Sequence, residues 1–404
     1  MRNIRIQSFA CAATLSIWSA LWSAEDAPPF KQAIDPIQFS FPADHASHAG
    51  YQTEWWYVTG NVNDEKGREF GYQFTIFRRA LSSKSAQERG RTSAWAADDF
   101  YLLHLAISDV EGKQHVDHEA LERGVLGVAG ATEISTVLKE RPPYDRITPE
   151  ITTREAVGSE PIRVWTSETS FVRQPNGWQL KANSSRVGMD LKLEEYADRP
   201  GKHMLHGKDG EKGLSRKGPK PGQASYYYSV PRLSTTGSLT LDGKQFKITS
   251  GVSWMDHEFG SNQLSTDQAG WEWFAVQLDS GVEIMLYVLR NKDGSIEPSS
   301  SGSWSDSVGC CHYFKVTDAM LKSGGEWKSP HSGATYPLEW DLHLPLNIVL
   351  KIKPVFADQE FHSAQGAKMN YYEGAIHVEG TQDGKPVKGR GYLEITGKNL
   401  GGRM

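Results

Sequence analysis

The stretch that decides the fold begins with Glu54-Trp55-Trp56-Tyr57-Val58-Thr59-Gly60. It passes through the turn Asn63-Asp64-Glu65-Lys66-Gly67 and ends with the run from Arg68 to Arg78. Within that last run, alternate residues are large and apolar, and they share one face because successive side chains of a strand point to opposite sides. Those residues are Phe70, Tyr72, Phe74 and Ile76. Two β-prone runs around a short glycine-bearing loop predict an antiparallel hairpin.

The rest of the chain repeats this pattern of short apolar runs broken by Gly, Asn and Asp. Predicted strands lie at Phe100–Asp109, Ile162–Trp165, Trp178–Ala182, Gly188–Leu193, Gly237–Leu241, Gln245–Trp254, Trp271–Asp279, Val282–Arg290, Trp340–His343, Ile348–Ile352, Ala375–Glu379 and Gly391–Thr396. Many short strands at nearly regular spacing predict an all-β barrel or sandwich. Helical periodicity is weak, and only Val125–Leu138 is a modest helix candidate.

A second hairpin resembles the first. It runs from Trp271-Glu272-Trp273 through Gly281 to Leu289-Arg290, with an aromatic strand, a glycine turn, an apolar alternating strand and a closing arginine. This similarity favours two similar barrels in one chain. A length of 404 residues also favours two domains.

Composition limits the partners. The formal net charge is −5, and a nucleic-acid binder needs a basic face, so we expect no nucleic-acid partner. The body of the chain has no apolar stretch approaching the roughly 20 residues that span a bilayer. We therefore expect no transmembrane segment in the mature chain.

The first 24 residues are typical of a secretory signal peptide. Arg2 and Arg5 precede an apolar run from Phe9 to Trp22, and small residues then precede Glu25. That order predicts export, to the periplasm or the medium. Cleavage after Ala24 or one residue earlier, or an uncleaved anchor, stays open.

The three cysteines do not form a disulfide framework. Cys11 lies in the predicted signal peptide, and Cys310 and Cys311 are adjacent and cannot link distant segments. A vicinal disulfide and two free thiols are both open for this pair.

The segment from Gly201 to Gln223 is rich in Gly, Lys, Pro and Ser. That composition indicates a mobile linker or a long loop. An ordered lid over a barrel mouth is the alternative, because long loops in compact domains often carry function.

Several motifs occur in an order that resembles the AttH family, which is related to bacterial carotenoid 1,2-hydratases. They are Phe41-Pro42-Ala43-Asp44-His45, Glu54–Gly60, Phe70–Thr75, Gly213–Gly218, Ala224–Ser229, Trp254–Gly260, Trp327–Pro330, Tyr336-Pro337, Asp358–Glu360, Tyr372–Gly374 and Gly391–Gly397. The resemblance implies an all-β fold with little helix, made of two lipocalin-like antiparallel barrels packed together. It places an N-terminal domain at 40–232 and a C-terminal domain at 236–398.

The densest chemistry lies in Trp254-Met255-Asp256-His257-Glu258. On a strand, Trp254, Asp256 and Glu258 share one face, and His257 points to the other. Burial of that face in an apolar cavity would raise a carboxyl pKa, so that Asp256 or Glu258 could act as an acid. His257 completes the predicted catalytic set. In the alternative reading, the two carboxylates brace an arginine or backbone amides at a barrel rim.

Aromatic side chains are predicted to line the ligand site, where their faces can stabilise a developing carbocation. They are Trp55, Trp56, Tyr72, Tyr227, Trp254, Trp271 and Trp273.

Two residue pairs are secondary candidates. Glu54 and Arg78 form a buried ion pair or, less simply, a catalytic pair. Ser215 and Lys217 are the nearest nucleophile and base, although no Gly-x-Ser-x-Gly elbow exists.

We expect no required metal and no other cofactor. Alternation sends His257 away from the neighbouring carboxylates, and Asp44, His45 and His48 lack the spacing of a zinc site. His104 lies in an apolar strand, where a hydrogen-bonded core histidine is expected.

Two function classes follow. The first is an enzyme that acts on a hydrophobic, isoprenoid- or lipid-like molecule by acid-initiated hydration, isomerisation or hydrolysis. The second is a non-catalytic carrier of such a ligand. A protein whose barrels are filled by their own side chains is a third possibility. The sequence leaves the ligand and the oligomeric state open.

Overall fold

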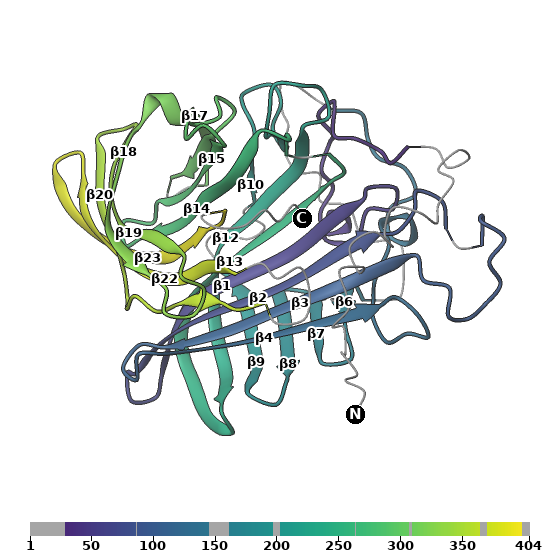
Figure 1. Cartoon of the computed structure of the whole chain (residues 1–404), viewed down its shortest axis with the longest axis horizontal. Helices are drawn as coiled ribbons and strands as arrows, with labels where there is room; N and C mark the ends of the chain where they lie inside the picture. Colours follow the sequence, from purple (N-terminus) through teal and green to yellow (C-terminus); the bar gives the residue numbers. More distant parts are fainter. Residues whose placement is uncertain are drawn as a thin grey trace, which may run out of the picture.

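The structure, a computed structural model, describes residues 29–85, 87–144, 161–196, 203–262, 264–306, 309–363 and 370–397. Two curled antiparallel sheets dominate these residues (Figure 1). Helix is limited to the short 3-10 segments η1 (Ala43–His45), η2 (Ile134–Thr136) and η3 (Val316–Asp318). The fold is all-β, as the alternating pattern predicts.

The first sheet has the order β4-β3-β2-β1-β13-β12-β9-β8-β7-β6-β5, and β10 and β11 also pair with β12. Its strands are β1 (Thr53–Asp64), β2 (Glu69–Ala80), β3 (Asp99–Asp109), β4 (Gln114–Arg123), β5 (Gly130–Ala131), β6 (Arg163–Trp165), β7 (Thr169–Gln174), β8 (Gly177–Asn183), β9 (Val187–Glu195), β10 (Met204–Leu205), β11 (Leu214–Arg216), β12 (Ala224–Leu241) and β13 (Lys244–Gly260). The sheet curls around an apolar core that includes Phe70, Phe74 and Leu105.

The second sheet has the order β17-β16-β15-β14-β23-β22-β20-β19-β18, and β21 pairs with β22. Its strands are β14 (Gln268–Leu278), β15 (Glu283–Asn291), β16 (Ser301–Ser305), β17 (Cys311–Lys315), β18 (Met320–Lys328), β19 (Thr335–Leu344), β20 (Ile348–Pro354), β21 (Glu360–Phe361), β22 (Tyr371–Gln382) and β23 (Lys385–Ile395). Phe274, Ile376 and Leu393 belong to its separate core. Two curled sheets with a core each match the predicted pair of lipocalin-like barrels.

The two predicted hairpins are β1–β2 and β14–β15. In the first, Glu54 pairs in register with Arg78, and their side chains form a buried ion pair. In the second, Arg290 is in register with Gly270 rather than Glu272, but its partly buried guanidinium still forms an ion pair with Glu272. Each hairpin therefore carries a glutamate–arginine ion pair, although the two pairs differ in register.

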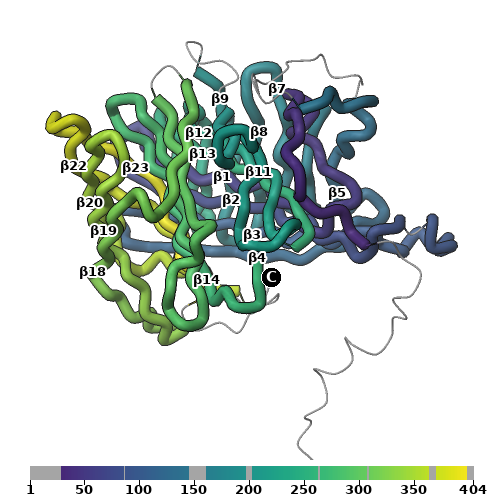
Figure 2. The backbone as a smooth tube through the Cα atoms, turned by 90° about the horizontal axis from the view of Figure 1, so that it is seen from above, coloured from purple at the N-terminus to yellow at the C-terminus, as the bar shows by residue number. Residues whose placement is uncertain are grey.

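The barrels pack through the outer faces of β1 and β13 on one side and β14, β22 and β23 on the other. Figure 2 shows the second sheet, in green to yellow, beside the first, in purple to teal. We call this contact zone the seam; its buried apolar members include Tyr57, Tyr227, Trp254, Trp273 and Tyr392. Hydrogen bonds such as Gln277 Nε2 to the Ser253 carbonyl (3.1 Å) cross it.

Two sequence predictions differ from the structure. Residues 125–138 form turns, β5 and η2 instead of a helix, because their glycines break helical continuity. β12 runs without a break through residues 232–236, where the domain boundary was predicted. The chain changes sheet only between β13 and β14, because the long β12–β13 hairpin belongs wholly to the first sheet.

The described part of the basic segment, from 203 to 223, packs against the protein rather than forming a solvated linker. Met204, Ser215 and Lys217 are buried, and β10 and β11 pair with β12. Residues 201 and 202 and the predicted signal peptide lie outside the described residues. Cys310 and Cys311 are free thiols. No helix among the described residues is long and apolar enough to cross a bilayer.

Gly71 tests how tightly the seam is packed. A Cβ at Gly71 would lie 2.7 Å from the Ala375 Cβ and 2.8 Å from the Tyr392 hydroxyl, across the seam. We expect Gly71→Val to lower the free energy of unfolding by about 1–3 kcal/mol, the usual cost of overpacking. Urea denaturation measures it. Gly324→Val, where a Cβ meets open space, is the control; equal effects of the two changes would contradict a tightly packed seam.

Candidate active site between the two sheets

Strand β13 divides its functional side chains between two environments. Tyr57 and Ser229 pair in register with Asp256 on either side, whereas Trp56 and Tyr228 pair with His257. Asp256 and Glu258 point into the seam, and His257 points into the first barrel. The predicted catalytic trio is therefore not one cluster, because strand alternation separates His257 from the two carboxylates.

Asp256 is held by three donors. Its Oδ2 accepts from the Tyr227 hydroxyl (2.5 Å), and its Oδ1 accepts from the Ser229 hydroxyl (2.5 Å) and the Trp254 indole (2.6 Å). His206 Nε2 lies 2.6 Å from the Ser229 Oγ and extends the network. Burial raises the pKa of Asp256 to about 7, and these hydrogen bonds only partly oppose the rise. Asp256 is therefore poised to donate a proton near neutral pH.

Aromatic rings from both sheets surround this carboxyl. Trp273 of β14 packs edge-on against Trp254, with ring centroids 6.4 Å apart, and against Tyr57, at 5.2 Å. The Trp273 indole donates to the Tyr227 hydroxyl at 3.0 Å. Trp254, Trp273 and Tyr227 thus meet at the predicted site, in an arrangement that presents π-systems to a positive charge.

Glu258 contacts Lys217, which belongs to the segment 203–223. Its Oε1 accepts from the Ser225 hydroxyl and lies 3.3 Å from Lys217 Nζ. Lys217 Nζ also lies 4.0 Å from the centre of the Tyr287 ring. The Ser215 hydroxyl is 3.2 Å from the Tyr287 hydroxyl. Ser215 and Lys217 thus each have another partner, and Lys217 is the counter-ion of Glu258, which favours the bracing reading for this carboxylate.

The second sheet adds two glutamates that the sequence analysis did not single out. Glu373 of β22 and Glu394 of β23 are directly opposite each other in register. Glu373 Oε1 accepts from the Tyr57 hydroxyl (2.7 Å), and Glu394 Oε1 accepts from the Trp271 indole (2.9 Å). Their signal in the sequence is strand alternation, since Glu373 lies two residues from Ala375, and Glu394 two residues from Tyr392, on the faces that enter the seam.

Burial and the mutual repulsion of the two carboxyl groups raise the pKa of Glu373 well above its usual range. The pKa of Glu394 rises to about 8, through burial and through the nearby charges of Asp256 and Glu258. Glu394 is partly exposed whereas Glu373 is 1% exposed, so the case for a neutral carboxylic acid is stronger for Glu373.

The other predicted ligand residues divide between the seam and the first barrel. Trp55 and Trp271 are partly exposed at an edge of the seam, next to its apolar cluster. Trp56 lies inside the first barrel, with its ring 4.8 Å from the His257 ring. Tyr72 is also inside, and its hydroxyl is 2.5 Å from the Ser253 Oγ.

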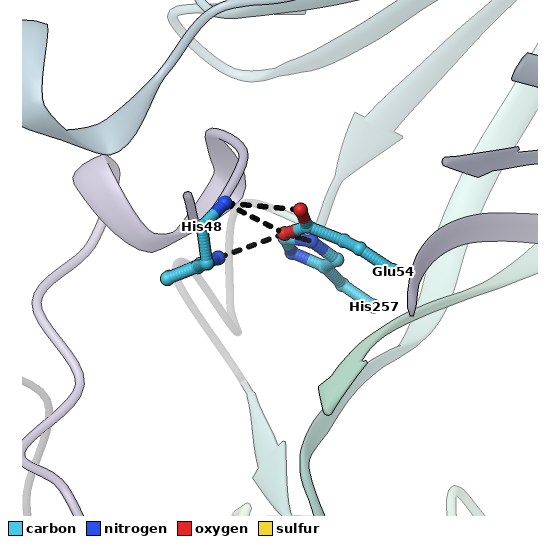
Figure 3. A group of neighbouring side chains, drawn as sticks. All are labelled: His48, Glu54 and His257. Carbon is cyan, nitrogen blue, oxygen red and sulfur yellow. Dashed lines mark hydrogen bonds and ion pairs between the residues drawn. The ribbon is translucent and has the colours of Figure 1, made fainter. Parts of the chain in front are cut away.

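His257 belongs to a second cluster, inside the first barrel, with His48 and Glu54 (Figure 3). Glu54 Oε1 lies 2.8 Å from His48 Nδ1 and 2.9 Å from His257 Nε2. Glu54 Oε2 accepts from Arg78 Nε at 3.0 Å. Burial alone would raise the pKa of Glu54, but Arg78 and the two histidines hold it well below its usual range. Burial lowers the pKa of His257.

The same three side chains are the group of described residues best placed to hold a metal ion. The donor set of two imidazoles and one carboxylate is of a kind that zinc uses. Arg78 already supplies a positive charge to the carboxylate, and both rings already contact its Oε1. The arrangement therefore fits a charge-balanced hydrogen-bond cluster better than a metal centre.

His104 also lies within hydrogen-bonding distance of polar partners, with Nδ1 2.8 Å from the Tyr371 hydroxyl. It is a buried core histidine, as its apolar strand predicts.

The pKa of Asp256 makes stability depend on pH. An unfolded aspartate loses its proton near pH 3.8, whereas the folded one keeps it to about pH 7. The wild type therefore loses stability as pH rises between these values. The variant Asp256→Asn has no carboxyl group at this position, so its stability does not fall with pH for this reason. Relative to the wild type, we expect the variant to gain more than about 1 kcal/mol between pH 4 and pH 8, measured by denaturant titration. A difference that stays constant with pH would mean that Asp256 is ionised throughout.

The first-barrel cluster is tested by Glu54→Ala. This change leaves Arg78 buried without its main partner, and we expect a loss of about 3–5 kcal/mol in unfolding free energy. Glu111→Ala is the matched control, because Glu111 pairs with Arg68 at the surface and is 72% exposed. The control should change stability by less than about 1 kcal/mol. Equal losses would show that the buried pair is energetically unimportant.

Comparison with known proteins identifies relatives of this chain. Kievitone hydratase from Fusarium solani subsp. phaseoli is 23% identical over 181 residues, which is 43% of this chain and 50% of that protein. The match thus spans about half the length of this curated relative. The crystal structure of kievitone hydratase from Nectria haematococca superposes with a TM-score of 0.60 at 14% identity, covering 91% of this chain and 98% of that one, and shows a shared fold.

An AttH protein from Nitrosomonas europaea is more similar. Its crystal structure superposes with a TM-score of 0.72 at 27% identity, covering 91% of this chain and 100% of that one. The model of the AttH-like family matches residues 32–398. This chain is a member of the AttH-like family.

Proposed function

We propose that this protein is an enzyme that protonates a hydrophobic substrate in the seam, with Asp256 as the acid. The observation that carries the proposal is the fully enclosed Asp256 carboxyl among aromatic rings, where burial raises its pKa to about 7. A carboxyl of this pKa is partly protonated at neutral pH and becomes a good base once it has given up its proton.

The reaction that fits best is addition of water to a carbon–carbon double bond. Asp256 transfers its proton to one alkene carbon, and the cation that forms on the other carbon is stabilised by Trp254, Trp273 and Tyr57. Water then attacks that carbon, and Asp256, now a carboxylate, accepts the surplus proton. The relatives named kievitone hydratase support a hydration rather than another acid-initiated reaction.

The edge of the seam at Trp55, Trp271 and Glu394 is where we expect the substrate to enter. These three side chains are partly exposed, whereas Trp254, Trp273 and Asp256 are buried. We propose an isoprenoid- or lipid-like substrate, and export directed by residues 1–24.

The first experiment identifies the ligand. The mature protein is purified from its own host, its N-terminus is sequenced, and solvent extracts are analysed by mass spectrometry. We expect an N-terminus near residue 25 and a bound apolar species. Incubating that species with the wild type should yield a product heavier by one water.

The same extract tests Asp256. We expect Asp256→Asn to lower turnover by at least about 100-fold with retained binding, because general acids contribute roughly 10²–10⁴-fold. The wild-type rate should fall as pH rises through about 7, where Asp256 loses its proton. Asp190→Asn, at an exposed aspartate on β9, is the control. A ligand recovered unchanged from the wild type would instead identify a carrier.

A further inference from the structure

Among the described residues, Glu373 Oε2 is one of the buried seam oxygens that have no hydrogen-bond partner. Glu373 Oε1 accepts from the Tyr57 hydroxyl, whereas Glu373 Oε2 is buried and makes no hydrogen bond. Buried carboxyl oxygens are almost always hydrogen-bonded, so an orphaned one needs an explanation. The opposite residue in register is Glu394, another acid, whose carboxyl bonds to Trp271.

The groups around Glu373 favour its neutral form. Across the seam it faces Tyr57 of β1, and on its own sheet it faces Glu394. Among the described residues no ion pair supplies Glu373 with a cation, and Lys217 is paired with Glu258. Burial and the charge of Glu394 both raise its pKa. Because Oε1 already accepts a hydrogen bond, the proton of the neutral acid lies on Oε2. Oε2 is then a hydrogen-bond donor that has no acceptor.

We propose that Glu373 Oε2 donates a hydrogen bond to an oxygen of the ligand. The ligand class is then an apolar, ring- or polyene-bearing molecule that carries a carbonyl or hydroxyl oxygen. A carboxylic acid kept neutral by an apolar site can serve as such a donor. This inference rests on the proposed ligand site in the seam and specifies the substrate that this site selects.

The donor would also orient the substrate. Asp256 comes from the first sheet and Glu373 from the second, and Tyr57 links the two, since it pairs with Asp256 through its backbone and bonds Glu373 through its side chain. A molecule whose oxygen is fixed at Glu373 presents its adjoining carbons to the face that carries Asp256. Glu373 is thus a specificity-determining residue, and the proton that is transferred still comes from Asp256.

The test uses two probes of closely similar shape, 2-acetylnaphthalene and 2-isopropylnaphthalene, which differ in having a ketone oxygen or a methyl group. Binding to the full mature protein is measured by calorimetry at pH 7. We expect the wild type to bind the ketone about 10-fold more tightly, the effect of one net hydrogen bond. The preference should fade only at high pH, because burial and the charge of Glu394 raise the pKa of the donor, Glu373, well above its usual range.

Three variants separate the explanations. Glu373→Met removes the donor and should abolish the ketone preference. Glu373→Gln keeps a donor and should retain the preference without its loss at high pH. Glu379→Met, at an exposed glutamate on the same strand, should behave like the wild type.

Equal binding of both probes to the wild type, or a preference that survives Glu373→Met, would overturn the role of Glu373 while the apolar seam of the proposed function stands. If neither probe binds the wild type at its solubility limit, the ligand site in the seam fails as well. A preference that vanishes in Glu379→Met would point to a general disturbance of β22 and also contradict the assignment.

Discussion

Removal of water from carboxyl groups between two packed sheets is the interaction on which the rest of this structure depends. Burial disfavours the charged form of an acid unless a cation or several donors compensate. At Glu258 Lys217 compensates, and inside the first barrel Arg78 does so for Glu54. At Asp256 and Glu373 compensation is incomplete, and the pKa of each rises. The molecule thus contains buried acids of two kinds, and only the second kind holds protons near neutral pH.

Most of the fold can be predicted from local patterns in the sequence. The alternation of Phe70, Tyr72, Phe74 and Ile76 predicts β2, and the glycine turns predict its hairpin and the second one. Residues 125–138 were harder, because a weak helical period competes with glycines that favour turns. The boundary between the sheets was harder still. The sequence predicts strands at β12 and β13 whether or not a domain boundary is placed between them. Only their pairing within the sheet shows that both belong to the first barrel.

The sequence predicts which residues of the site share a strand face, but not what that face contacts. Strand alternation is local, so the sequence alone places Asp256 on one face and His257 on the other. Which face meets water, a barrel interior or a second sheet is a long-range property. The role of Trp273 beside Asp256 depends on β14 lying against β13, and Glu373 lies more than a hundred residues away in the chain. Lys217 was read as part of a basic loop, whereas its ammonium group compensates a buried carboxylate.

The seam is shared between two halves that have separate cores. Asp256 lies on one half, and the residues that set its surroundings, Trp273 and Glu394, lie on the other. In a chimaera that joined residues 29–262 to the second barrel of a relative, both barrels could remain intact while the environment of Asp256 changed. An ancestral protein of this design could therefore acquire a new substrate through changes in β14, β22 and β23, with the acid and its strand unaltered.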